Sequence, residues 1–74
     1  MQITVNFMND LYVEESLFVP NKTTAKREAR RGLKNLPSDF YATVVRFSER
    51  TGYQWLNASG GWENDKVKLY RNQF

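Results

Sequence analysis

The sequence contains no cysteine and no histidine. Their absence excludes disulfide bonds, thiol chemistry, zinc sites of the usual kind and the commonest general base of enzymes. No apolar run approaches about 20 residues, the length that a membrane-spanning helix requires, and the first residues lack the basic-then-apolar layout of a signal peptide. We therefore expect a soluble, intracellular protein without membrane association, metal or cofactor, which acts by binding and not as an enzyme.

Aromatic residues, by contrast, are plentiful for so short a chain. The 74 residues are 41% apolar, 15% aromatic and 26% charged, which is typical of a folded domain and not of a disordered chain. A chain of this length does not divide into two cores, so we expect a single domain over residues 1–74. A domain this small buries only about 60% of its unfolded surface, and its stability therefore depends on densely packed large side chains.

Positive charge is concentrated in one segment. The net charge is +3, but residues 1–21 carry three acidic side chains and no basic one, whereas residues 22–35 carry six basic side chains and one acidic one. Residues 36–74 are nearly balanced, with five basic and four acidic groups. This distribution excludes an acidic mimic of nucleic acid, and it permits contact with a phosphate backbone or an acidic protein groove.

Residues 3–19 predict a β-hairpin. Apolar and polar residues alternate from Ile3 to Phe7, which is the pattern of a strand with one buried face. Asn9-Asp10 suits a two-residue turn. The return strand, residues 11–19, has an expected bulge near Glu14-Glu15, where the alternation breaks, and its apolar face comprises Leu11, Val13, Leu17 and Val19.

A helix is expected to begin near Thr23 or Thr24, where either hydroxyl would cap the first turn, and to end by Asn35 to Leu36, before Pro37. At about 100° per residue, one arc of this helix is small and apolar, and it contains Ala25, Ala29, Gly32, Leu33 and Leu36. The opposite arc is basic and contains Lys26, Arg27, Arg30, Arg31 and Lys34. The small residues predict that the helix lies close on a sheet.

Three further segments have strand patterns. Residues 40–48 are rich in β-branched and aromatic residues, and residues 53–58 follow after a turn at 50–52. Residues 66–70 alternate charged and apolar side chains, as an edge strand with lysines on its open face does. The predicted fold class is α+β: an antiparallel sheet of four to five strands with one helix packed on one face, in the order β-β-α-β-β, with residues 66–70 as the fifth strand.

The basic arc of the helix is the strongest indication of function. Its side chains are like-charged at i, i+4 spacing, and three of the segment's cations crowd the positive end of the helix dipole, so both effects destabilise the isolated helix. We interpret the arc as a binding face for an anionic partner, against the alternative of a solvated surface. The predicted partner-binding or nucleic-acid-binding residues are Lys22, Lys26, Arg27, Arg30, Arg31 and Lys34.

Aromatic side chains offer a second interface. Most of the eleven aromatic residues must form the core, but one helix covers only one face of a sheet. An exposed patch that contacts a partner is therefore the alternative, made of Tyr53, Trp55 and Trp62. The two adjacent carboxylates Glu14 and Glu15 point to opposite faces of their strand, so they do not form an acid/base pair, and we predict no catalytic residue.

Four short patterns lie in the middle of the chain: Ala25-Lys26-Arg27-Glu28-Ala29-Arg30-Arg31, Thr43-Val44-Val45-Arg46-Phe47, Gly52, and Trp55-Leu56. With them, residues 25–58 resemble the small phage-encoded anti-CRISPR proteins of the type I-F inhibitor group. The resemblance implies an antiparallel sheet with one helix, and a non-enzymatic inhibitor that sits on the backbone subunits of an RNA-guided surveillance complex. It also implies that Lys26, Arg27 and Arg31 lie at the nucleic-acid groove of that complex and obstruct hybridisation of target DNA.

Three functions are therefore open. The first is a phage- or mobile-element-encoded inhibitor in the cytoplasm of a bacterial host cell, which binds a protein–nucleic acid complex such as a CRISPR surveillance complex and blocks target DNA binding by occupancy. The second is a small basic module that contacts DNA or RNA directly with the same helix face. The third is a small structural or assembly protein whose interface is aromatic. The sequence assigns no oligomeric state.

Overall fold

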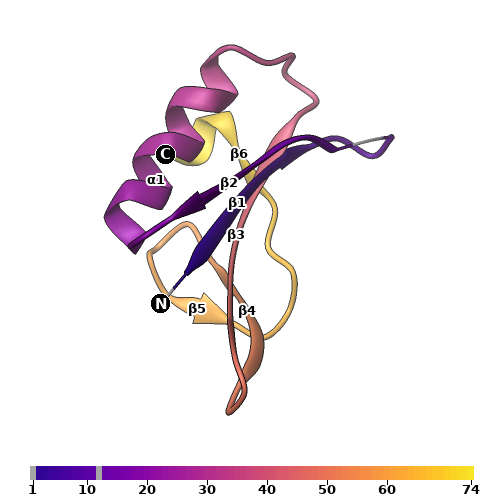
Figure 1. Ribbon diagram of the computed structural model, residues 1–74. Helices are drawn as coiled ribbons and strands as arrows, with labels where there is room; N and C mark the ends of the chain where they lie inside the picture. Colours follow the sequence, from indigo (N-terminus) through magenta and orange to yellow (C-terminus); the bar gives the residue numbers. More distant parts are fainter. Residues whose placement is uncertain (1, 12) are drawn as a thin grey trace.

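The computed structural model describes residues 2–11 and 13–74 of the chain. One helix crosses one face of an antiparallel sheet, which confirms the α+β class (Figure 1). The elements in chain order are β1 (Ile3–Met8), β2 (Val13–Val19), α1 (Lys22–Lys34), β3 (Tyr41–Ser48), β4 (Gly52–Leu56), β5 (Trp62–Glu63), β6 (Leu69–Tyr70) and a short 3-10 helix, η1 (Arg71–Gln73).

The sheet has the strand order β2-β1-β3-β4-β5, with neighbouring strands antiparallel. The single strand expected over residues 66–70 is wrong in detail, because only Leu69–Tyr70 pair, with Ala42 and Tyr41 of β3, and a further short strand forms at Trp62–Glu63. Lys66 and Lys68 do not stand on an open strand face, since both ammonium groups lie over the ring of Tyr41, 5.4 and 5.0 Å from its centroid. The two lysines therefore cover that end of the sheet.

The N-terminal hairpin forms with the expected bulge, but the connection between Met8 and Val13 is longer than the expected two-residue turn at Asn9-Asp10. Phe7 pairs with Glu15 but Met8 pairs with Val13, so Glu14 is the extra residue of β2. The bulge puts Val13 on the face opposite to the buried Phe7, and Val13 is exposed. Leu11 lies in the loop before β2, where its amide donates to Asn9 Oδ1 at 2.8 Å, and its side chain is 87% exposed. The prediction that Leu11 and Val13 share the buried face of Leu17 and Val19 is therefore wrong.

Helix α1 begins earlier than expected, at Lys22. Asn21 has extended backbone, and its Oδ1 accepts a hydrogen bond of 2.8 Å from the amide of Thr24, so Asn21 is the cap and neither threonine is. At the other end the helix stops at Lys34, and the amide of Asn35 donates to the Gly32 carbonyl oxygen at 3.1 Å. The helix thus ends by Asn35, as expected.

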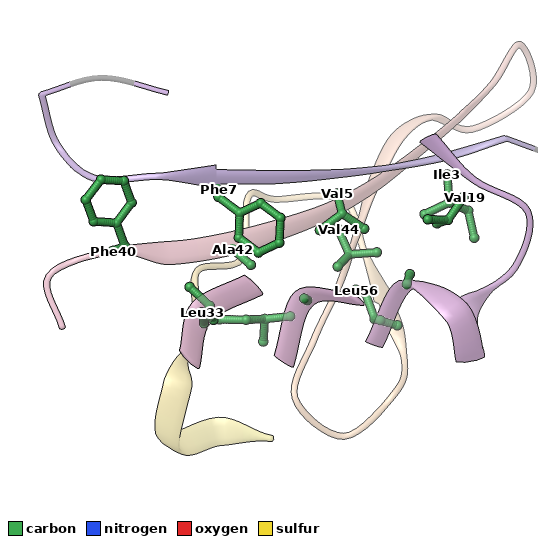
Figure 2. Close-up of a cluster of buried hydrophobic side chains, with 12 residues drawn as sticks. Ile3, Val5, Phe7, Val19, Leu33, Phe40, Ala42, Val44 and Leu56 are labelled. Atoms are coloured by element: carbon green, nitrogen blue, oxygen red, sulfur yellow. The ribbon is translucent and has the colours of Figure 1, made fainter. Parts of the chain in front are cut away.

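The core lies between α1 and the sheet. Ala25, Ala29 and Leu33 of the helix are buried in one cluster with the inward side chains of β1, as predicted from the small apolar arc. Figure 2 shows Leu33 facing Phe7 and Ala42 of the sheet. Leu56 at the end of β4 and Leu69 of β6 complete this core from the C-terminal half of the chain. The other face of the sheet, which we call the open face, carries no helix.

Candidate functional site

The structure places the six predicted cations on α1, with exposed side chains turned away from the core. Lys22 differs from the rest, because its Nζ donates a 2.8 Å hydrogen bond to the carbonyl oxygen of Gly60. This bond ties the first residue of the helix to the loop between β4 and β5. Lys22 therefore has a structural contact of its own, whereas the remaining five cations follow the helix surface.

Glu28 interrupts the positive charge of this surface. One carboxylate oxygen lies 3.2 Å from Nη2 of Arg31, and the other lies 3.8 Å from Nε of Arg27. The like-charged pair Arg27 and Arg31 is thus bridged by an acid, and the repulsion expected between them is partly relieved. Exposed ion pairs of this kind contribute about 0–1 kcal/mol, so both guanidinium groups stay available to a stronger partner.

Lys26, Arg30 and Lys34 form what we call the cationic row. They recur every four residues, one turn apart, and the row extends about 12 Å along the helix axis at 1.5 Å per residue. Among the residues that the structure describes, no carboxylate forms an ion pair with any of the three. The row is the least compensated charge on the helix.

A hollow of about 360 Å³ opens beside the cationic row. It is lined by Lys26, Arg27 and Arg30 of the helix, by Ala58 of the loop between β4 and β5, and by Gln73 and Phe74. Phe74 also packs against the core, and η1 lies beside α1 (Figure 1). Sequence reasoning missed Ala58, Gln73 and Phe74, because only the fold brings these positions next to a helix that ends at Lys34.

The three predicted aromatic contact residues do not lie together. Tyr53 and Trp55 are on the open face, and their ring centroids are 6.2 Å apart. Trp62 pairs with the buried Leu56, so it points to the core side, where the Arg46 guanidinium carbon lies 4.1 Å from the centroid of its ring. Phe47, which was not predicted, takes the place of Trp62 in the patch, with its ring centroid 4.9 Å from that of Tyr53.

Other kinds of site find little support. In the described portion of the chain no three acidic side chains converge as metal ligands would, and no helix there is both long and apolar enough to cross a membrane. Comparisons with protein families, with curated proteins and with solved structures found no match for this chain. The cationic row with its hollow and the aromatic open face are surfaces of the described chain that a partner could use.

Proposed function

We propose that the protein is a binding domain without enzymatic activity, which docks the cationic row of α1 on the polyanionic groove of a protein–nucleic acid complex. It would act as a phage- or mobile-element-encoded inhibitor in the bacterial cytoplasm, by occupying a site that target DNA needs, and a CRISPR surveillance complex is the type of target proposed. The observation that carries this proposal is the row of three exposed cations without a carboxylate partner in the described structure.

The arrangement of charge on the helix supports an anionic partner. The first turn of α1 contains no acidic residue, although acids are the favourable residues next to the positive end of a helix dipole. Lys26 and Arg30, and then Arg30 and Lys34, are like-charged neighbours at i, i+4 spacing, which destabilises a free helix slightly. A bound polyanion would attract these cations and so offset both their repulsion of one another and their unfavourable interaction with the helix dipole.

Occupancy is a mechanism that these side chains can supply. Ammonium and guanidinium groups donate charge-assisted hydrogen bonds to phosphate oxygens, and such contacts position a protein on a nucleic acid without reading its sequence. The hollow beside Phe74 adds an apolar wall next to the cations. A cationic face of this kind blocks a polyanionic groove by binding to it, and the inhibition needs no chemical step.

The second candidate function is direct binding of DNA or RNA by the same face. The hollow favours it, because an aromatic ring beside Lys26 and Arg30 is the combination that proteins use to hold an unpaired base and its phosphates. The two functions differ in what they require. A naked oligonucleotide suffices for the second, whereas the first needs the protein component of the complex.

Affinity purification from a bacterial lysate tests the proposal and separates the two functions. The bait is the tagged protein, with the triple variant Lys26→Gln, Arg30→Gln and Lys34→Gln beside it, and each lysate is used with and without nuclease. The matched control is Arg50→Gln, Lys68→Gln and Arg71→Gln, which removes the same charge from exposed positions outside α1.

We expect a defined set of nucleic-acid-associated proteins to be retained by the parent and the control, and lost from the row variant. Retention after nuclease treatment supports a protein–nucleic acid complex, while loss after nuclease, together with binding of a naked oligonucleotide, supports the second candidate. Equal retention by the parent and the row variant would refute both.

A further inference from the structure

The open face of the sheet carries a continuous apolar patch. Phe18, Thr4, Val45 and Trp55 lie side by side across four strands, because Thr4 pairs with both Phe18 and Val45, and Val45 pairs with Trp55. Phe47 and Tyr53 form the next cross-strand pair on this face, two residues along. We call the side chains of Phe18, Phe47, Tyr53 and Trp55, with Thr4 and Val45 between them, the aromatic patch.

The rings of this patch are unusually exposed for their size. The side chains of Phe18, Phe47 and Tyr53 are 71%, 53% and 60% exposed. Burying a whole aromatic side chain removes about 150–250 Å² from water, so these three rings still offer roughly 350 Å² to a partner. Exposed apolar surface gathered in one place marks an interaction site more often than scattered single residues do.

Two hollows lie beside the exposed rings of the aromatic patch, and side chains of a partner could enter them. A hollow of about 310 Å³ is lined by Gln2, Thr4, Val45, Arg46, Phe47 and Tyr53. A second hollow, of about 420 Å³, is lined by Gln2, Phe18, Val19 and Pro20. The exposed rings thus border two shallow hollows, and a two-fold dimer would bring the same patch of both copies together.

The absence of charge in the aromatic patch indicates which class of partner fits it. None of the six residues of the aromatic patch is charged, so a phosphate backbone meets no cation there. Arg46, which lines the first hollow, donates from Nε and Nη2 to Gln54 Oε1 at 3.0 and 2.8 Å and stacks on Trp62, on the core side of the sheet. Lys66 and Lys68 lie over Tyr41, at the other end of the open face. Glu63, next to Trp55, accepts a 2.7 Å hydrogen bond from Asn57 Nδ2. The aromatic patch itself therefore offers a nucleic acid fewer charged contacts than the cationic row does.

A second copy of the chain fits these observations. Each copy carries a net charge of +3, and α1 alone holds six basic side chains against one acidic one, so a dimer with both helices outward keeps these charges apart. The open face is the side of the sheet that α1 leaves uncovered (Figure 1). Sheets pack on one another through such faces at about 10 Å, with side chains interdigitating.

We propose that the protein forms a two-fold homodimer in which the aromatic patches of two copies pack against each other, sheet to sheet. The three exposed rings supply nearly half of the about 800 Å² per partner that a standard interface buries, and Gln2, Thr4, Val45, Trp55 and Pro20 around them extend the contact. The cationic rows then lie on the two outer surfaces, free of the interface.

Sedimentation equilibrium of the full chain, from micromolar to submillimolar concentration, tests the dimer. The variants are Phe47→Ala, Phe18→Ala and Tyr53→Ala, whose parent side chains are exposed, so the fold should survive, and far-UV circular dichroism with thermal melting verifies that it does. The matched control is Leu11→Ala, which removes an exposed apolar side chain outside the patch.

We expect a monomer–dimer equilibrium in the parent, an at least tenfold rise of the dissociation constant in each folded patch variant, and no change in the control. A parent that stays monomeric throughout the range overturns the proposal, as does a dimer that the patch variants leave intact. Capture of a host protein that is lost only in the patch variants, with a monomeric parent, assigns the face to that protein instead. The triple variant of the cationic row should dimerise as the parent does, so failure of the dimer and failure of the proposed function are seen separately.

Discussion

The ring of Phe7 in β1 lies directly against Gly32 of α1. A β-carbon built on Gly32 would come closer than 3.0 Å to two atoms of this ring, which no real side chain tolerates. Phe7 is itself buried, with 2% of its surface exposed. Because Gly32 has no side chain, the helix lies closer to the sheet at this point than a larger residue would allow.

Gly32→Ala should destabilise the protein, although alanine is the better helix former by about 1 kcal/mol. Overpacking a filled core costs about 1–3 kcal/mol, so we expect a net loss in the free energy of unfolding measured by urea titration. In the background Phe7→Leu, which shortens the opposing side chain, the same substitution should cost less. A more stable Gly32→Ala variant would show that the ring does not limit the approach of the helix.

Ala29→Arg should unfold the domain. Ala29 is fully buried between α1 and the sheet, and an arginine there places a charged group in the core at a cost of several kcal/mol. Circular dichroism and the dispersion of the amide NMR spectrum measure the loss. Arg30→Ala, one position further on the exposed side, is the control and should keep the native spectrum.

Asn21→Ala should lower the free energy of unfolding by about 1 kcal/mol, because it removes the side chain that caps the Thr24 amide. Thr23→Ala should change it little, since Thr23 is exposed and does not cap. Paired urea titrations of the two variants compare them directly. A larger loss in the free energy of unfolding for Thr23→Ala than for Asn21→Ala would show that the threonine, as the sequence suggested, caps the helix.

Affinity for a nucleic-acid partner should fall with added salt, and the cationic row should carry most of this dependence. Each phosphate contact contributes about 0.7–0.9 to the slope of log affinity against log salt, so the row variant should lose about 2–3 from that slope. Fluorescence anisotropy of the partner at several salt concentrations gives the slope. Arg27→Gln with Arg31→Gln should lose less, because Glu28 already offsets part of their charge. A slope that is equal in the row variant and the parent would place the binding elsewhere.

Local patterns in the sequence were enough for the N-terminal hairpin, the bulge and the two faces of the helix. The alternation of Ile3 to Phe7 and the spacing of Ala25, Ala29 and Leu33 are properties of single elements, and burial follows from them directly. The exposure of Leu11 and Val13 was not predicted, because the bulge at Glu14 shifts the alternation. Residues before the bulge therefore do not share the face of those after it.

Features that depend on contacts between distant segments could not be predicted in this way. The β6 pairing with Tyr41 and Ala42, the bond from Lys22 to Gly60 and the position of Phe74 beside the helix each join segments far apart in the chain. Trp62 reads as an exposed aromatic residue in the sequence, and only its pairing with Leu56 turns it towards the core. The cations of the site were therefore predictable, but the hollow beside them was not.

The central place of β1 in the sheet determines when the chain is able to fold during its synthesis. β1 is made first, yet one of its two neighbours, β3, begins only at Tyr41, and the core residues Leu56 and Leu69 are made later still. Until then the nascent hairpin has an unpaired edge and an uncovered apolar face, which are the features that chaperones and proteases recognise. A chain interrupted before Leu69 would thus lack one of the side chains that fill this core, and only a chain that includes Leu69 is able to complete it.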